Sequence, residues 1–296
     1  MTQRSLEMNR TNPSPKPRRR SSPQWFQHIP AYLLLGGWSL FTILAISWVA
    51  LASVKTNRDV FRKPFEIPLN PQFENYTRVW EKSQVGQSFI NSLILVSISV
   101  VIVLLVSAPA AYVLSRAKFK GRGFLTTVFI AGIGIPYPLL FIPLFALLAG
   151  LNLINTMQGL IIVYVSLSIP FTVYILTGFF GSLPQEIEDA AVIDGCNDLD
   201  VFWRVMLPLA SPGILTAAIF NFIALWNEFQ LALIFIQDPK MRPLSLSLYS
   251  LKNAMTYSGD WAGLFAGVVI VIVPTVILFV LLSERMISGI TLGSVK

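Results

Sequence analysis

The stretch FINSLILVSISVVIVLLVSAPAAYVL, residues 89–114, decides the fold class because it is predominantly apolar and holds no charged residue. About 20 residues of α-helix, rising roughly 1.5 Å each, cross a hydrocarbon core of about 30 Å. Strands of a membrane barrel would instead alternate apolar and polar residues over about ten positions, which this stretch does not do. It therefore predicts a membrane-spanning helix.

The composition extends this prediction to the whole chain. Of its 296 residues, 54% are apolar and only 12% are charged, and the mean hydropathy of +0.65 excludes a water-soluble domain. Five further apolar runs are long enough to span. We predict an all-α polytopic membrane protein with six transmembrane helices, over residues 30–54, 89–114, 124–148, 153–180, 213–236 and 263–282.

The first 29 residues differ from the rest because they are rich in Pro, Ser and Arg. This composition predicts a disordered, basic cytoplasmic tail, and an alternative is that Arg18, Arg19 and Arg20 bind anionic lipid. The apolar run that follows is too long for a signal peptide and lacks a small-residue cleavage site. It is expected to stay as an anchor, so the permease domain would cover residues 30–296.

Orientation follows from the Lys and Arg residues. The short segment RAKFKGRG, residues 116–123, carries four positive charges and no acid, and such loops stay in the cytoplasm. By parity both termini are then cytoplasmic, as is the loop over residues 181–212. This arrangement places the larger share of the 22 basic residues inside.

The loop over residues 181–212 contains PQEIEDAAVIDG, residues 184–195, in which four acids lie in an otherwise basic protein. We expect a helix over residues 183–193, capped by Ser182 with Gln185 three residues later. Gly195 suits the left-handed conformation that closes a helix.

A second short helix should follow the turn at Gly195. Asn197 or Asp198 can cap the segment LDVFWRVM, and Pro208 would end it. In the first helix, Ala190 and Ala191 form a small face that permits close approach of another surface. An amphipathic loop lying on the lipid surface is the alternative.

The spacing within this loop resembles a known family motif. Asp189, Ala190, Ala191, then Gly195, and later Val205 and Leu207-Pro208 are similar to the EAA loop of importer permeases of the ATP-binding cassette superfamily. Asp189 stands where the motif has Glu, and Val205 where it has Ile. Both changes keep the chemistry, although the shorter Asp side chain would form an ion pair or cap differently.

Other segments extend the resemblance to the carbohydrate-importing, maltose-type branch over residues 73–296. They are FENYTRVW, FINSL, GLNLINTMQGLI, IPF, WNEFQLAL and the terminal ISGITLGSVK. The resemblance implies a type I importer in the inner plasma membrane of a prokaryote, with a second related permease subunit, two cytoplasmic ATP-binding subunits and an extracytoplasmic solute-binding protein. The loop after the fourth span would couple to the ATPase, through Glu188, Asp189, Ala190, Ala191, Asp194, Gly195, Leu207 and Pro208.

The chain itself is not expected to be an enzyme. No G-x-x-x-x-G-K-[ST] loop occurs in it, so ATP would be used by a partner subunit and no cofactor bound here. One His, His28, and one Cys, Cys196, are too few for a His-based zinc site or a Cys-His nucleophile, and no metal is expected.

The fifth span carries the polar residues expected to mark a pathway, because polar groups inside a span are costly and tend to face a cavity or a partner. Asn221 and Glu228 are seven residues apart, which places them on one face of a continuous helix. Amides, carboxylates and aromatic faces suit sugars, so Asn221, Asn227, Glu228 and Trp226 are the candidate substrate residues. The alternative is that these side chains bond a neighbouring helix or lie at the outer interface.

The third span should be bent, because Gly132, Gly134, Pro136 and Pro138 interrupt helical hydrogen bonding. A hinge and simple packing are both open as its purpose. The competing function is a secondary transporter or channel, for which only Glu228 is a candidate ion-coupling carboxylate. The sequence does not indicate which sugar or polyol is carried.

Overall fold

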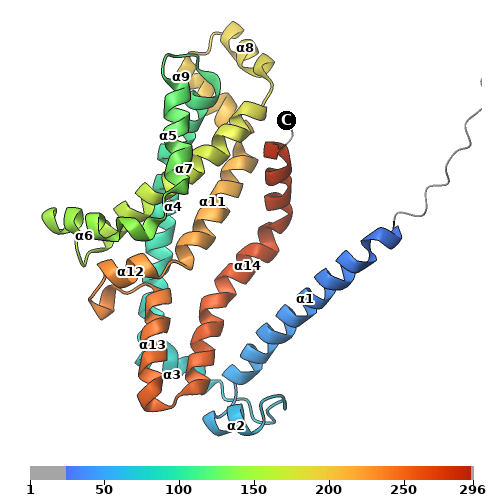
Figure 1. Cartoon of the computed structure of the whole chain (residues 1–296), viewed down its shortest axis with the longest axis vertical. Coiled ribbons are helices and arrows are strands. Elements are labelled where there is room, and N and C mark those ends of the chain that lie inside the picture. The colour runs from blue at the N-terminus through green and yellow to red at the C-terminus, as the bar shows by residue number, and fades with distance from the viewer. Residues whose placement is uncertain (1–24, 295–296) are drawn as a thin grey trace, which may run out of the picture. The chain divides into compact units, whose positions relative to one another are not determined.

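A computed structural model of the protein describes residues 25–294, and every regular element among them is a helix (Figure 1). The chain divides between Ser47 and Trp48 into two compact units. Helix α1 (Trp25–Ser53) begins within the stretch expected to be a tail. The expected lipid-binding residues Arg18, Arg19 and Arg20 lie outside the described residues.

Four of the six expected spans are long, apolar helices. They are α1, α4 (Val85–Arg116), α7 (Met157–Ser182) and α14 (Trp261–Ser294). Two further helix pairs are apolar enough to span but are each bent, so the described residues hold four unbroken candidate spans, or up to six if each bent pair is one span.

The third expected span is one of the bent pairs, as its glycines and prolines predicted. Helix α5 (Arg122–Gly134) ends before Pro136, and a short helix η1 (Tyr137–Leu140) leads into α6 (Phe141–Gly150). The two halves meet at 96°. Proline supplies no backbone N–H and restricts the residue before it, which explains the position of the bend.

The fifth expected span differs from the prediction at both ends. Helix α11 (Ser211–Trp226) stops ten residues before the expected end, and a separate short helix α12 (Gln230–Phe235) follows. At its start, α11 meets the helical segment Asp198–Leu209 at 71°. The expectation of one helix over residues 213–236 was therefore wrong, because residues 227–229 form a break.

The helices of the second unit pack closely where small residues allow it. Helix α4 lies along α7, and α11 and α14 pack beside them (Figure 1). Gly213 of α11 leaves room for the Phe179 ring of α7, since a Cβ there would lie 2.3 Å from the ring. Two apolar clusters fill the interior, one around Tyr164, Trp226 and Phe235 and one around Phe180, Phe202 and Met206.

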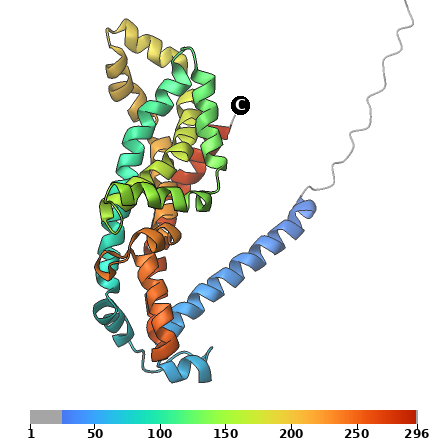
Figure 2. The ribbon, with the colours of Figure 1, turned by 60° about the vertical axis from the view of Figure 1, so that its left-hand side comes forward.

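The connecting helices gather at opposite ends of the second unit (Figures 1 and 2). One end carries α8 (Gln185–Ile193), α9 (Asp198–Asp200), the π-helix η2 (Val201–Met206) and α10 (Leu207–Leu209). The other end carries α2 (Asn57–Arg62), α3 (Glu74–Lys82), η3 (Pro239–Met241) and α13 (Leu244–Ser258). Loops on the two sides of a membrane would be separated in this way.

Candidate functional sites in the helical loop and the broken span

The first helix of the loop over residues 181–212 is α8, which begins two residues later than expected. Pro184 occupies its N-cap position. The hydroxyl of Ser182 instead donates to the carbonyl of Phe179 at 2.8 Å. The predicted Ser182 cap was wrong because the end of α7 already uses that hydroxyl.

The turn between the two loop helices was predicted correctly. Gly195 has a φ of +88°, in the left-handed region that glycine adopts without strain. The amide of Cys196 donates to the carbonyl of Ala191 at 3.0 Å, which closes α8. Asn197 then caps the next helix, since its Oδ1 accepts the amide of Asp200 at 2.9 Å.

The second helical segment runs without interruption through α9, η2 and α10, and ends at Leu209, one residue beyond Pro208. Its π-helical part buries Val201, Phe202 and Met206. Trp203 on the other side of the same turn is 52% exposed. The segment thus has one face against the helix bundle and one face left uncovered.

Arg116, the last residue of α4, is the internal partner of the acidic loop. Its Nε lies 3.3 Å from Oε1 of Glu188, an ion pair between two largely covered side chains. Its Nη2 also donates to the carbonyls of Phe180 and Leu183. Burial raises the pKa of Glu188, while Arg116 opposes that rise and Asp189 adds to it. Arg116 therefore fastens α8 to the ends of α4 and α7.

The residues expected to contact an ATPase divide into an inner and an outer set. Ala191 is buried against the second apolar cluster, and Glu188 faces Arg116. The two alanines thus do not form one open face: the close approach that Ala191 permits is to the protein's own core. Leu207 is half-buried against the same cluster. The outer, exposed set is Asp189, Ala190, Asp194, Gly195 and Pro208.

Large apolar side chains on the uncovered side of the loop were missed from the sequence. Val192, Ile193, Leu199 and Trp203 are all exposed, Ile193 to 85%. We call these four residues the loop rim. Their signal was an apolar pair directly after Ala191 within an acidic segment, where an outward-facing residue would ordinarily be polar. Exposed apolar residues gathered on one loop mark an interaction surface.

The break in the fifth span is organised by Glu228. Its Oε1 accepts the amide of Leu231 at 2.7 Å, and its Oε2 accepts the amide of Ala232 at 3.2 Å. The hydroxyl of Tyr164 on α7 donates to the same Oε2 at 2.7 Å. Glu228 therefore caps the first turn of α12 and ties it to α7, instead of standing two turns from Asn221 on one helix face.

Two other candidate pathway residues are buried between helices. Asn221 is 3% exposed, and its Nδ2 donates to Oγ1 of Thr172 at 2.9 Å and to the carbonyl of Ala217 at 2.8 Å. Trp226 is 1% exposed, and its Nε1 donates to the carbonyl of Val271 on α14 at 3.1 Å. Both side chains make the bonds to neighbouring helices that the alternative interpretation describes.

Exposed polar groups do occur at the break itself. Asn227 and Gln230 are both exposed. Oε1 of Gln230 accepts the hydroxyl of Tyr137 at 2.8 Å, and Tyr137 lies at the bend of the third span. The breaks of two spans are thus joined by an exposed polar contact. Tyr137 and Gln230 were not among the predicted site residues, although Gln230 is a polar residue of the same expected span, two positions after Glu228.

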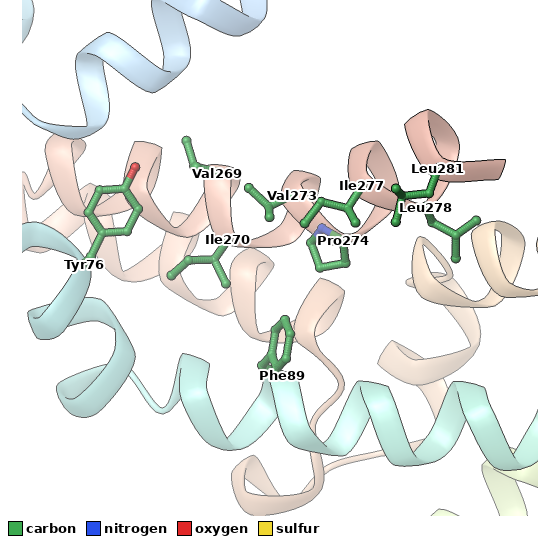
Figure 3. A pocket seen from close by; sticks show the side chains of 9 residues that line it. All are labelled: Tyr76, Phe89, Val269, Ile270, Val273, Pro274, Ile277, Leu278 and Leu281. Carbon is green, nitrogen blue, oxygen red and sulfur yellow. The ribbon is translucent and has the colours of Figure 1, made fainter. Parts of the chain in front are cut away.

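A cavity of about 610 Å³ lies along α14 (Figure 3). Its lining comes from Tyr76, Phe89 and seven apolar residues of α14, including Pro274. Among the lining residues, Tyr76 alone has a polar side-chain group, and its hydroxyl already shares a hydrogen bond with the Ser53 hydroxyl at 2.6 Å. A sugar needs several hydrogen-bonding partners, so this cavity does not suit one.

Comparison with known proteins identifies a family. Residues 103–285 match the family described as binding-protein-dependent transport system inner membrane component. The chain is 36% identical over 266 residues to the diacetylchitobiose uptake system permease protein NgcG of Streptomyces coelicolor, covering 90% of this chain and 88% of that protein. It is 34% identical over 250 residues to the sulfoquinovosyl glycerol transport system permease protein SmoH of Agrobacterium fabrum, covering 84% and 87%.

The fold is also that of a solved structure. A chain from the crystal structure of a bacterial ABC transporter involved in the import of the acidic polysaccharide alginate superposes with a TM-score of 0.75 at 24% identity. The superposition covers 89% of this chain and 98% of that one. The two chains therefore share one overall fold.

Proposed function

Since the chain belongs to the family of inner-membrane components of binding-protein-dependent transport systems, we propose that it is a permease subunit of an ATP-driven importer for a sugar, oligosaccharide or polyol. The transport systems of NgcG and SmoH act on diacetylchitobiose and sulfoquinovosyl glycerol, which supports a carbohydrate substrate. The observation that carries the proposal in this chain is the loop over residues 181–212, with its fixed inner face and its uncovered rim.

The proposed assembly holds this chain and a second, related permease, two cytoplasmic ATP-binding subunits and an extracytoplasmic solute-binding protein. It lies in the inner membrane of a prokaryote with both termini in the cytoplasm. The basic segment 116–123 supports that orientation, because Arg116 lies at the same end of the unit as α8. ATP is used by the ATP-binding subunits, and this chain supplies half of the pathway.

Coupling is proposed to divide between the two sides of the loop. Helix α8 is attached to the helix bundle by Arg116, Glu188 and Ala191, so a displacement of the loop would be transmitted to α4 and α7. The exposed Asp189, Ala190, Asp194 and Gly195 and the loop rim are proposed to contact the ATPase. Leu207 and Pro208 join the loop to α11, where the 71° bend lies.

The substrate pathway is proposed to pass the break between α11 and α12. Asn227 is exposed there, and Gln230 and Tyr137 offer an amide and a hydroxyl beside it. The walls of the pathway are stabilised by hydrogen bonds to α7 and α14 from Asn221, Trp226 and Glu228. This division places ligand contacts on uncovered groups and keeps paired groups for structure.

The competing function is a secondary transporter, in which Glu228 would bind the coupling ion. Three hydrogen bonds already occupy its two oxygens. Releasing them to bind an ion would leave two backbone amides and a buried hydroxyl without partners, at about 1–3 kcal/mol each. That cost favours the ATP-driven importer.

The test is uptake by vesicles that hold the complete complex with its binding protein. A labelled form of the sugar identified in the copurified binding protein should accumulate only when ATP is hydrolysed on the ATPase side. Accumulation should persist when ionophores collapse the proton and sodium gradients. Uptake driven by an ion gradient, without an ATPase subunit, would overturn the proposal in favour of the secondary transporter.

A further inference from the structure

The connection between α1 and α3, residues 54–72, has a fixed shape although it contains only one short helix. Its ends are joined by a hydrogen bond from the amide of Gln72 to the carbonyl of Val54 at 2.7 Å. Nδ2 of Asn75 donates to the carbonyls of Ser53 at 2.8 Å and Lys55 at 2.9 Å. The 54–72 loop therefore presents its surface residues in defined positions.

The interior of the 54–72 loop is filled by Lys55, which is only 2% exposed. Its ammonium donates to the carbonyls of Lys63 at 2.7 Å and Pro64 at 2.9 Å. Burial lowers the pKa of Lys55, and the nearby carboxylates of Glu66 and Asp59 oppose that change. These bonds fix the backbone directly before Phe65.

Beyond Pro64 the loop turns three apolar side chains outward. Phe65 is 84% exposed, Ile67 81% and Leu69 98%, on a segment of turns and bends that follows the hydrogen bond from the Glu66 amide to the Lys63 carbonyl. Leaving such side chains in water forgoes about 1.5–3 kcal/mol each relative to burial. A patch of this kind on a loop of fixed shape calls for a contacting surface.

The depth of the loop relative to α1 indicates which surface. Nε1 of Trp48 donates to the carbonyl of Pro64 at 3.0 Å. Trp48 lies five residues before the end of α1, about 7–8 Å back along the helix, and helical side chains lean further toward the N-terminus. The candidate span Ile29–Ser53 has 25 residues, about 38 Å, which exceeds a hydrocarbon core of about 30 Å by some 4 Å at each end. Pro64 thus lies near the boundary between acyl chains and headgroups.

Two tryptophans form aromatic pairs in this part of the second unit. Phe61 packs edge-on against Trp261 at the start of α14, with ring centroids 5.3 Å apart, and Trp48 packs likewise against Phe265 at 5.3 Å. Tryptophan and tyrosine concentrate at membrane interfaces, which fits Trp48 and Trp261.

The charges of the loop fit an anionic surface. Asp59 accepts the hydroxyl of Thr56, and Glu66 pairs with Lys63 at 2.8 Å. Arg58 and Arg62 are exposed and form no ion pair with any of the described residues. Basic side chains in this position are attracted to lipid phosphates.

We propose that the 54–72 loop is a membrane-interface anchor, which dips beside the end of α1 so that Phe65, Ile67 and Leu69 enter the edge of the acyl region. Arg58 and Arg62 lie closer to the water than these three side chains, at the level of the lipid phosphates. The anchor fixes the end of α1 to the leaflet and to α14. This inference does not depend on the substrate or on the energy source of transport.

The test measures how deeply the loop residues lie in lipid. In the full complex, with Cys196→Ser as background, Leu69→Cys and, separately, Phe65→Cys are labelled with an environment-sensitive nitrobenzoxadiazole dye. The complex is placed in phosphatidylethanolamine and phosphatidylglycerol vesicles with or without lipids that carry a nitroxide near the top of the acyl chain. Tyr257→Cys is the matched control, because Tyr257 is 94% exposed at the end of α13, on the same end of the unit.

Nitroxide lipids should quench the dye at positions 69 and 65 several-fold more strongly than at 257, and a water-soluble quencher should show the opposite order. Equal, weak lipid quenching at all three positions would overturn the proposal. So would dye at 69 and 65 that is shielded from both quenchers, since that result would indicate a protein subunit as the occupant.

Discussion

The carboxylates of Glu188 and Glu228 lie in two different regions of the second unit, and each bonds groups that its sequence position did not indicate. Glu188 was expected to face an ATPase, and Glu228 a substrate. Glu188 instead pairs with Arg116 at 3.3 Å. Glu228 accepts hydrogen bonds from Tyr164, Leu231 and Ala232. Each carboxylate holds a short helix against the long helix α4 or α7.

The difference between the two lies in their partners. Glu188 faces a cation that also bonds two carbonyls at the end of α7, and its helix remains reachable from outside. Glu228 faces one hydroxyl and two amides inside the bundle, without a cation among the groups it bonds. Loss of the deeper carboxylate leaves more unpaired groups, so the two sites should respond to mutation with different magnitudes.

Glu228→Ala should have the largest effect. It removes the acceptor for two backbone amides and one buried hydroxyl, at about 1–3 kcal/mol for each group left unpaired. We expect a marked loss of purified yield and thermal stability of the complex, together with loss of uptake. Glu228→Gln keeps one acceptor oxygen and should recover part of both. An alanine variant of normal stability that fails only in transport would show that Glu228 acts on the substrate and does not hold the break.

Arg116→Leu should have the next largest effect, because it leaves Glu188 and the carbonyls of Phe180 and Leu183 without their common donor. Breaking such a partly covered pair costs about 1–3 kcal/mol. Liganded binding protein should no longer stimulate the ATPase activity, although the complex stays assembled. Arg116→Lys keeps the charge with fewer donors, so its coupling should be intermediate. Normal stimulation in the leucine variant would contradict the proposed fastening role.

Gly195→Val should have a smaller effect, on the order of 1–2 kcal/mol, because a β-branched residue is strained at a φ of +88°. Membrane insertion should persist while copurification of the ATPase declines. Gly195→Asn is the matched control, since asparagine tolerates the left-handed region. No Cβ clash confounds the comparison, because the space around Gly195 is open. If the valine variant copurifies with the ATPase at wild-type yield, the turn at Gly195 is not needed for docking.

The pH dependence of Glu188 should give the smallest effect. Burial raises the pKa of its carboxyl, so the folded protein binds this proton more tightly than the unfolded chain does. The contribution of this group to stability is therefore present below its ordinary pKa and is lost as pH rises through the raised value. Glu188→Gln should flatten the fall in melting temperature over that mildly acidic window. If the melting temperature falls equally steeply with pH in the wild type and in Glu188→Gln, other groups cause the fall.

The sequence predicted those features that depend on neighbours along the chain. The spans at α4, α7 and α14, the bend near Pro136 and the left-handed Gly195 follow from apolar length, missing amides and backbone sterics. Asn197 was one of the two caps proposed for the second loop helix. The Ser182 cap failed because that hydroxyl had a competing acceptor, Phe179, that local pattern cannot rank.

The partners of polar side chains could not be predicted from spacing. Asn221 and Glu228 are seven residues apart, but a helix that stops at Trp226 places them on different elements. Arg116 and Glu188 are 72 residues apart, and only the packing of α4 against α7 brings them together. The loop rim was missed because burial of Ala191 decides which side of α8 faces outward.

Site-specific crosslinking along α8 tests most directly whether the outward face of this loop contacts an ATPase. In the Cys196→Ser complex, cysteines at Ile193 and at Ile187 lie on the same helix, the first exposed and the second half-buried. A short thiol-reactive photocrosslinker at position 193 should join this chain to an ATP-hydrolysing subunit, and the same reagent at position 187 should not. Crosslinks to the ATPase from 187 and none from 193, in a complex that still transports, would contradict the account.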